Sequence, residues 1–298
     1  MIKIENLSFS YGRNTVLKGI TLNLEPGRIY GLLGENGVGK TTLLTLLSGL
    51  KKPKEGYIRI GSGLSCNDSA VIRNEKGRIV SSAGIDPYRR DPEYLEELMY
   101  IPDEVVPVPL KAETWAKEYG AFRQHFTMER FREIMSLMDV DTEQKMSSMS
   151  NGQLKKTYIA FALASKPAYI YMDEPTNGLD IPSKSTFRSA LLKYTPEESI
   201  VIIATHQVRD LENIIDPIII LDRNEVLLNA SVETITKKLF FDYGSVRKEN
   251  ALWCEPTPEG LIQVVVNSEG LDSKVNIEAL FNTVDKNKET IKSIFSHE

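Results

Sequence analysis

The feature that most constrains this chain of 298 residues is a glycine-rich segment between two apolar stretches. Residues 34–41 are Gly-Glu-Asn-Gly-Val-Gly-Lys-Thr and fit the pattern G-x-x-x-x-G-K-[ST]. The apolar run at 28–33 predicts a strand buried on both faces, and residues 41–48 predict a helix. Glycines let backbone N–H groups approach phosphate oxygens closely, and a helix N-terminus favours an anion. The segment therefore predicts a phosphate-binding loop in an α/β fold.

The residue types in this loop indicate how a nucleoside triphosphate would be held. Lys40 is placed to reach the β- and γ-phosphates, and the Thr41 hydroxyl is placed to hold Mg²⁺. The alternative is a tight glycine turn with an incidental lysine. The predicted ATP-binding residues are Gly34, Glu35, Asn36, Gly37, Val38, Gly39, Lys40, Thr41 and Thr42.

The pattern along the rest of the chain predicts a mainly parallel sheet. Apolar runs at 168–172, 200–204 and 217–221 alternate with helical patterns, which is typical of an α/β core. Period-two alternation before residue 25 predicts an N-terminal antiparallel β region. Residues 92–99 and 110–165 have helical patterns. We predict a P-loop NTPase core.

The domain prediction follows from shifts in these patterns. Residues 1–225 form an ATPase domain with a helical subdomain inserted at about 103–165 and an extra loop or hairpin at about 61–84. Residues 226–298 form a small C-terminal extension, where glycines separate short segments. The 61–84 segment is interpreted as a surface loop or as a feature that binds a partner.

Composition excludes several classes of protein. Hydrophobic residues make up 41% of the chain, which excludes a disordered one. There are 36 Lys and Arg against 41 Asp and Glu, and the net charge of −5 argues against broad nucleic-acid binding. Cys66 and Cys254 lie too far apart to suggest a disulfide framework or a metal motif. No apolar run approaches membrane-spanning length, so we expect a cytoplasmic protein.

An acid pair follows the apolar run at 168–172. Asp173 would then lie at the carboxyl edge of the sheet, where a carboxylate can hold Mg²⁺ directly or through water. Glu174 is placed to orient an attacking water or to accept its proton. The alternative is that both acids cap a helix. Beside a phosphate loop, the metal and water roles are favoured.

Four further segments resemble the ABC-type ATPase family. Residues 173–180, Asp-Glu-Pro-Thr-Asn-Gly-Leu-Asp, resemble its Walker B acid, catalytic glutamate and D-loop, which ends at Asp180. Residues 149–153, Met-Ser-Asn-Gly-Gln, resemble its signature, usually Leu-Ser-Gly-Gly-Gln. Residues 204–206 resemble the switch histidine segment with His206, and Tyr11 matches the aromatic residue that stacks on adenine. The resemblance covers roughly residues 1–228.

The resemblance implies an ATPase that binds ATP and Mg²⁺ and works as a dimer. Two nucleotides would be held head to tail, with Ser150, Asn151, Gly152 and Gln153 acting on the partner chain's ATP. The implied partners are a second ATPase subunit, in a homodimer or a heterodimer, and a transmembrane permease on whose cytoplasmic face the chain lies. The permease would dock on residues 103–165. Simpler interpretations stay open: an ordinary helix cap at Ser150, a core histidine at His206 and a packing role for Tyr11.

Two departures from the family pattern leave the hydrolysis rate open. Asp103 stands where the family usually has a glutamine near Mg²⁺, and a carboxylate there can also hold metal-bound water. Asn151 replaces a signature glycine. Residues 275–281 resemble a segment found in many exporter ATPases, which favours an ABC exporter subunit. The alternatives are a soluble ABC-type ATPase in an assembly role and a nucleotide-gated module with weak hydrolysis.

Overall fold

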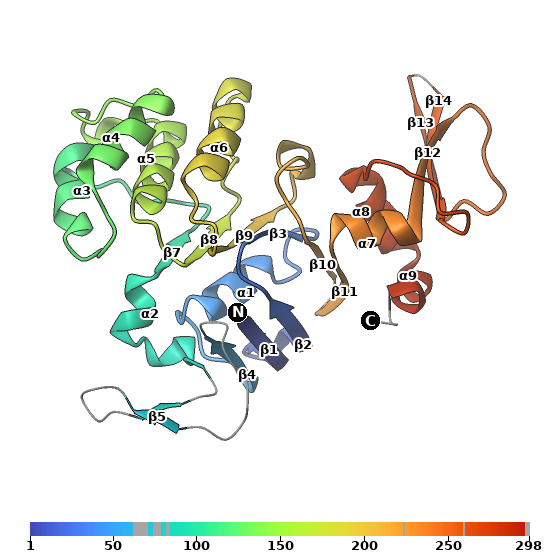
Figure 1. Ribbon diagram of the computed structural model, residues 1–298, viewed down its shortest axis with the longest axis horizontal. Helices are drawn as coiled ribbons and strands as arrows, with labels where there is room; N and C mark the ends of the chain where they lie inside the picture. Colours follow the sequence, from blue (N-terminus) through green and yellow to red (C-terminus); the bar gives the residue numbers. More distant parts are fainter. Residues whose placement is uncertain (62–70, 74–78, 82–83, 223, 259, 296–298) are drawn as a thin grey trace.

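The computed structural model describes residues 1–61, 71–73, 79–81, 84–222, 224–258 and 260–295. Cys66 and much of the 61–84 segment lie outside these residues. Within that segment, strand β5 (Val71–Arg73) pairs antiparallel with β6 (Ile79–Ser81). Figure 1 shows three groups of elements around the β3 strand: helices on one side, an N-terminal sheet below, and a C-terminal group on the other side.

A six-stranded sheet forms the centre of the molecule, in the order β11-β10-β3-β9-β8-β7. Its bounds are β3 Arg28–Leu33, β7 Leu98–Ile101, β8 Tyr169–Asp173, β9 Ile200–Thr205, β10 Ile218–Asp222 and β11 Glu225–Ala230. The strands from β10 to β7 are parallel, and only β11 runs antiparallel to its neighbour. The expected mainly parallel sheet is therefore confirmed.

The apolar runs become the buried strands of this sheet. Every residue of β9 is buried, as expected for a strand covered on both faces. The carboxyl ends of β3, β8 and β9 lead directly into the phosphate loop, the acid pair and His206. Since parallel strands end at one edge of a sheet, these three segments share that edge.

The N-terminal antiparallel region is also confirmed. Strands β1 (Ile2–Tyr11), β2 (Asn14–Leu24) and β4 (Glu55–Ile60) form a separate sheet in the order β2-β1-β4. The alternating side chains of β1 and β2 are buried in one core with helix α1 (Lys40–Leu47) and one face of the six-stranded sheet. This packing fixes the helix that begins at the phosphate loop.

The helical block contains α3 (Ala112–Gly120), α4 (Met128–Leu137) and α5 (Asn151–Ala164). Trp115 of α3 packs on Phe161 of α5, with ring centroids 4.7 Å apart, so aromatic contacts join these helices. Upstream, the segment 92–99, which is mainly helical in pattern, is helical only in its first part. Helix α2 covers only Pro92–Glu96, and β7 begins at Leu98. Pairing with β8 decides this strand, which local periodicity could not show.

The C-terminal part adds a third sheet, in the order β12-β14-β13. It consists of β12 Leu239–Gly244, β13 Trp253–Thr257 and β14 Gly260–Val266, with helices α7 Val232–Lys238, α8 Ile277–Lys286 and α9 Lys288–Phe295. The central sheet continues to Ala230, past the predicted boundary at 225, and the domain division itself stays a prediction. The remaining long helix, α6 (Ile181–Tyr194), follows β8. Among the described residues, no helix combines the length and apolarity needed to cross a bilayer.

Candidate nucleotide-binding site

The phosphate loop lies between β3 and α1, as the sequence predicts. Gly37 and Gly39 adopt φ of 84° and 113°, values that glycine adopts readily. A Cβ on Gly39 would also approach Leu17 Cδ2 to 2.8 Å, so a side chain there would displace the Leu17 side chain in addition to straining the backbone. No side chain caps α1 at Gly39, so the N–H groups of the first turn of α1 have no capping side chain as a partner. The backbone therefore forms an anion-binding end.

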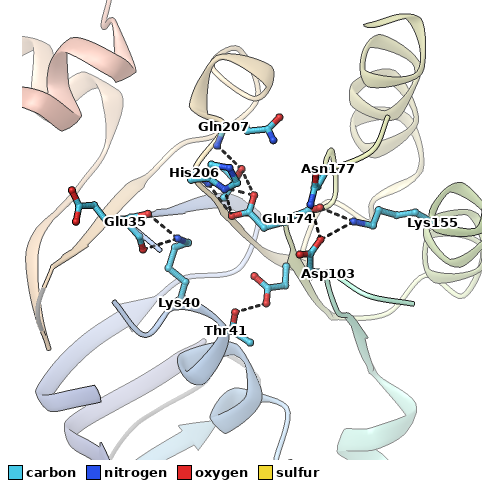
Figure 2. Close-up of polar contacts among 12 residues, drawn as sticks. Glu35, Lys40, Thr41, Asp103, Lys155, Glu174, Asn177, His206 and Gln207 are labelled. Carbon is cyan, nitrogen blue, oxygen red and sulfur yellow. Dashed lines mark hydrogen bonds and ion pairs between the residues drawn. The ribbon is translucent and has the colours of Figure 1, made fainter. Parts of the chain in front are cut away.

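Lys40 is buried and held by its own loop. Its Nζ donates to the carbonyl oxygens of Gly34 at 2.7 Å and Glu35 at 3.1 Å (Figure 2). Burial lowers the pKa of Lys40, and the nearby carboxylates of Glu174 and Asp173 oppose that shift. The ammonium is thus placed at the loop beside two acids.

Thr41 and Asp173 meet across the site. The Thr41 hydroxyl donates to Asp173 Oδ2 at 2.5 Å, which joins the first turn of α1 to the end of β8 (Figure 2). Burial raises the pKa of the Asp173 carboxyl, and the Thr41 hydrogen bond opposes the rise. No group of three His, Cys, Asp or Glu side chains suited to a metal occurs among the described residues. Two oxygen donors nevertheless fit Mg²⁺, which usually takes one or two protein ligands and completes its shell with phosphate and water.

Glu174 is the most constrained side chain of the site. Its exposed fraction is 8%, and its φ of 45° lies in the left-handed region that few residues other than glycine adopt. The Thr205 hydroxyl donates to Oε2 at 2.9 Å, and the His206 backbone N–H donates to Oε1 at 3.0 Å. The His206 ring Nδ1 lies 2.7 Å from the same Oε1. The end of β9 therefore orients the carboxylate that follows β8 (Figure 2).

A cavity of about 410 Å³ brings many of the predicted residues together, whereas Gly34, Glu35 and His206 line a neighbouring cavity. Tyr11 from the end of β1 lies at one wall, and its hydroxyl is 3.4 Å from Thr42 Oγ1. The Lys51 ammonium sits 4.1 Å from the centre of the Tyr11 ring, a cation–π contact. The cavity is lined by Tyr11, Asn14, Val16, Asn36, Gly37, Gly39, Lys40, Thr41, Thr42, Asp103, Asp173 and Glu174.

The segment at 150–153 lies elsewhere in the same chain and lines neither this cavity nor the larger one described below. Ser150 caps α5: its Oγ accepts from the Gln153 backbone N–H at 3.2 Å, and the Gln153 side chain accepts from the Ser150 N–H at 3.0 Å. A Cβ on Gly152 would lie 2.9 Å from the carbonyl oxygen of Gly178, so this turn packs against the segment before Asp180. Asp180 in turn caps α6 by accepting from Ser183 N at 2.9 Å.

Comparison with known families identifies the family to which this chain belongs. The sequence model described as ABC transporter matches residues 17–177, which is more than half of the chain. The chain belongs to the ABC transporter family. Within that family it is an ATP-binding subunit with the ATPase fold, and ATP hydrolysis is its enzymatic activity.

Individual relatives agree with this assignment. The chain is 28% identical over 241 residues to the linearmycin resistance ATP-binding protein LnrL of Bacillus subtilis, covering 80% of this chain and 72% of the relative. It is 26% identical to the methionine import ATP-binding protein MetN of Clostridium tetani, covering 99% of this chain and 84% of the relative. A solved dimeric ATP-binding cassette bound to ADP and Pi superposes with a TM-score of 0.62 and 22% identity, covering 78% of this chain and 98% of the cassette. The last similarity shows the fold.

This ABC family member departs from the usual pattern at Asp103, and the structure shows what surrounds it. Asp103 Oδ1 accepts from Lys155 Nζ at 3.1 Å and from Asn177 Nδ2 at 3.2 Å (Figure 2). Lys155 also donates to the backbone carbonyl of Glu174 at 3.0 Å. Sequence reasoning gave no role to Lys155, which belongs to no residue pattern with an expected chemistry. It also gave none to Asn177, although the segment 173–180 was singled out. It also missed the role of Thr205 on Glu174, although the segment 204–206 was singled out.

A second and larger cavity of about 770 Å³ borders the same edge of the ABC fold. It shares Asn36 with the nucleotide cavity and contains His206, but its far wall comes from Glu278 and Phe281 of α8. Arg209 after β9 donates to Glu278 at 2.7 Å. The C-terminal part therefore contacts the loop that carries His206.

Proposed function

We propose that this ATPase subunit dimerises around two MgATP and drives a separate membrane permease, as part of an exporter. The observation that carries the proposal is the division of the predicted site within one chain. The cavity gathers Tyr11, the loop, Asp173 and Glu174, while residues 150–153 lie outside it. A signature segment with no phosphate of its own chain to contact requires a second chain.

Within each chain of the proposed dimer, the roles of the cavity residues follow from their contacts. Tyr11 stacks on adenine, and Lys40 with the loop N–H groups of residues 34–42 binds the phosphates. Thr41 and Asp173 hold Mg²⁺, which neutralises charge on the phosphates when it is bound. Asp103 lines the same cavity and is placed to hold metal-bound water.

Glu174 and His206 supply the proposed chemistry. A carboxylate held by Thr205 and the His206 backbone is oriented before substrate arrives, and it can align water and take up its proton. The His206 ring, in contact with the same carboxylate, is placed to contact the γ-phosphate. Because the donors are fixed by the end of β9, little reorganisation is needed at the moment of reaction.

The permease partner is proposed to dock on the helical block. Val106 and Phe122 expose 71% and 77% of their surface there, although both are apolar. Such docking would hold the subunit at the cytoplasmic face of a membrane. Export is favoured by the segment at 275–281 and by the similarity to a resistance protein. The similarity to an importer subunit that extends over 99% of this chain favours import as the second candidate.

The test of the dimer uses two defects on different chains. Glu174→Gln damages the part of the chain that binds its own ATP. Ser150→Ala damages the part that acts on the partner chain's ATP. In a mixed dimer of the two variants, one site carries both defects and the other carries none. Co-expression with two affinity tags and sequential purification should therefore restore up to half of the wild-type ATPase rate. If the signature acted within its own chain, both sites would be defective and the rate would not exceed the residual rate of the Ser150→Ala dimer.

A second experiment addresses the partner and the direction of transport. The full chain should purify from membranes with a protein that contains spanning helices, and the pair should transport in vesicles only with ATP on the chain's own side. Movement of substrate away from the ATP-containing side supports the exporter; movement toward that side supports the importer. Purification without any membrane protein would support the alternative of an assembly ATPase. A wild-type chain that binds ATP but hydrolyses it only weakly would instead support the nucleotide-gated module.

A further inference from the structure

Lys155 is a charged side chain inside the protein. Its exposed fraction is 4%, and it lies in the second turn of α5, the helix that Ser150 caps. Buried lysines are rare unless they are paired, because removing an ammonium from water is costly. Two of its N–H groups have partners from different parts of the chain: the Asp103 carboxylate at 3.1 Å and the Glu174 carbonyl at 3.0 Å. The position of this ammonium is therefore tightly defined.

The two partners of Lys155 both belong to the nucleotide cavity. Asp103 is the half-exposed acid that follows β7, with 41% of its side chain accessible, and it lines the cavity beside Asp173 and Glu174. The Glu174 carbonyl also accepts from the Asn177 backbone N–H at 3.1 Å. These two donors satisfy the carbonyl of a residue whose backbone is held at positive φ. Lys155 thus touches the acidic wall and the backbone that presents the predicted catalytic glutamate.

From these contacts we propose that Lys155 is a positioning residue of the ATPase site. Its ammonium partly neutralises Asp103 and fixes the backbone of Glu174, and it joins both to the helix that begins with the signature. Without it, Asp103 keeps the hydrogen bond from Asn177 but loses its ion pair, in a cavity that already holds Asp173 and Glu174. The inference rests on the proposed function for the role of Glu174, whereas the pairing of Lys155 with Asp103 stands on the structure alone.

The effect of Lys155 on the charge of Asp103 can be measured by comparing ATP binding with and without Mg²⁺. An Asp103 without its ion pair should repel Mg-free ATP, which carries the full phosphate charge, more than it repels MgATP. Calorimetric titration of Lys155→Met should show Mg-free ATP binding roughly tenfold weaker, whereas MgATP affinity changes less than about threefold. Asp103→Asn should shift the affinity for Mg-free ATP in the opposite direction. The double variant should return to within about threefold of the wild type.

The chain supplies a matched control in the neighbouring residue. Lys156 lies on the same helix but does not line the cavity; its Nζ donates to the Met138 carbonyl at 2.8 Å and to Ser183 Oγ at 3.4 Å. Lys156→Met should leave both affinities within about twofold of the wild type. Lys155→Arg retains the charge and should behave more like the wild type than Lys155→Met does. Equal effects of Lys155→Met and Lys156→Met, or no recovery in the double variant, would overturn the proposal.

A second measurement does not depend on nucleotide chemistry. Hydrogen exchange of the peptide covering residues 173–180 should become about tenfold faster in Lys155→Met and stay unchanged in Lys156→Met, because only the first loses the bond to the Glu174 carbonyl. If the wild-type chain failed to hydrolyse ATP, the hydrolytic part of the proposed function would fall while this comparison still decided the role of Lys155. Unchanged exchange in both variants would refute that role even in an active enzyme.

Discussion

The phosphate loop and the signature segment are both helix beginnings, yet one chain completes only the first. At α1 the N-terminus has no side-chain cap, and its loop opens into a cavity with Lys40, Thr41 and two acids. At α5 the side chains of Ser150 and Gln153 already satisfy each other's backbone N–H groups, and the segment lines neither cavity. Two helix N-termini of one chain therefore differ in their caps and in their tertiary placement, and only the first borders the cavity.

The largest effect should come from Glu174→Gln, which removes the proposed base and keeps the shape of the side chain. General acid–base groups contribute roughly 10²–10⁴-fold, so the ATPase kcat should fall by that order while ATP affinity is retained. Steady-state hydrolysis and nucleotide titration measure the two quantities, and gel filtration with ATP should show a trapped dimer. Full activity in this variant would remove Glu174 from the base role.

Lys40→Ala should have the next largest effect, and it tests the phosphate loop. Charge-assisted hydrogen bonds to phosphate contribute about 1.5–3 kcal/mol, which corresponds to roughly 10–150-fold in ATP affinity. Equilibrium binding of MgATP to the variant checks this expectation. Unchanged affinity would show that the loop is a glycine turn without a phosphate site.

Ser150→Ala tests the signature segment and should have a smaller effect. Loss of a cap costs about 1 kcal/mol of stability, and loss of one phosphate contact should slow turnover about five- to tenfold. MgATP binding by the isolated chain should stay within about twofold, because the cavity does not contain this residue. If Ser150→Ala weakened ATP binding as much as it slowed turnover, the signature would belong to its own chain's site. The contrast between the phosphate loop and the signature segment would then be wrong.

Arg209→Ala should have the smallest effect. The Arg209 side chain is 82% exposed and its partner Glu278 is 44% exposed, so solvent screens the ion pair between the His206 loop and α8. The free energy of unfolding should change by less than about 1 kcal/mol, and the ATPase rate should stay within about twofold. Denaturant unfolding and a steady-state assay measure both. A large loss of activity would show that the C-terminal part controls the nucleotide edge.

Much of the central fold could be predicted because its strands are continuous apolar runs ending at recognisable residues. The runs at 28–33, 168–172 and 200–204 became β3, β8 and β9. Strand β7 was missed because its four residues follow a short helix without a break, and only pairing with β8 makes them a strand. The domain boundaries stay predictions, since composition shifts do not show where packing changes.

The candidate site could be predicted where a motif ties residue types to chemistry, as at the phosphate loop and the acid pair. The structure gathers those residues, while their individual roles stay predictions. Lys155 could not be found in this way, since a lysine in a helical pattern normally indicates a solvated face. Its partners Asp103 and Glu174 lie 52 and 19 residues away in sequence, and only the fold brings them together.

The position of β7 has a mechanical consequence. Among the strands that the structure describes, β7 is at the edge of its sheet and pairs with β8 alone. Strand β3, which leads into the phosphate loop, pairs on both sides, with β10 and β9. Bending the backbone after an edge strand disturbs one hydrogen-bond ladder, and bending it after a central strand disturbs two. Any bend between the central sheet and the helical block should therefore occur more readily at residues 102–104 than at the phosphate loop. Such a bend would move the N-terminus of α5 and leave the phosphate loop in place.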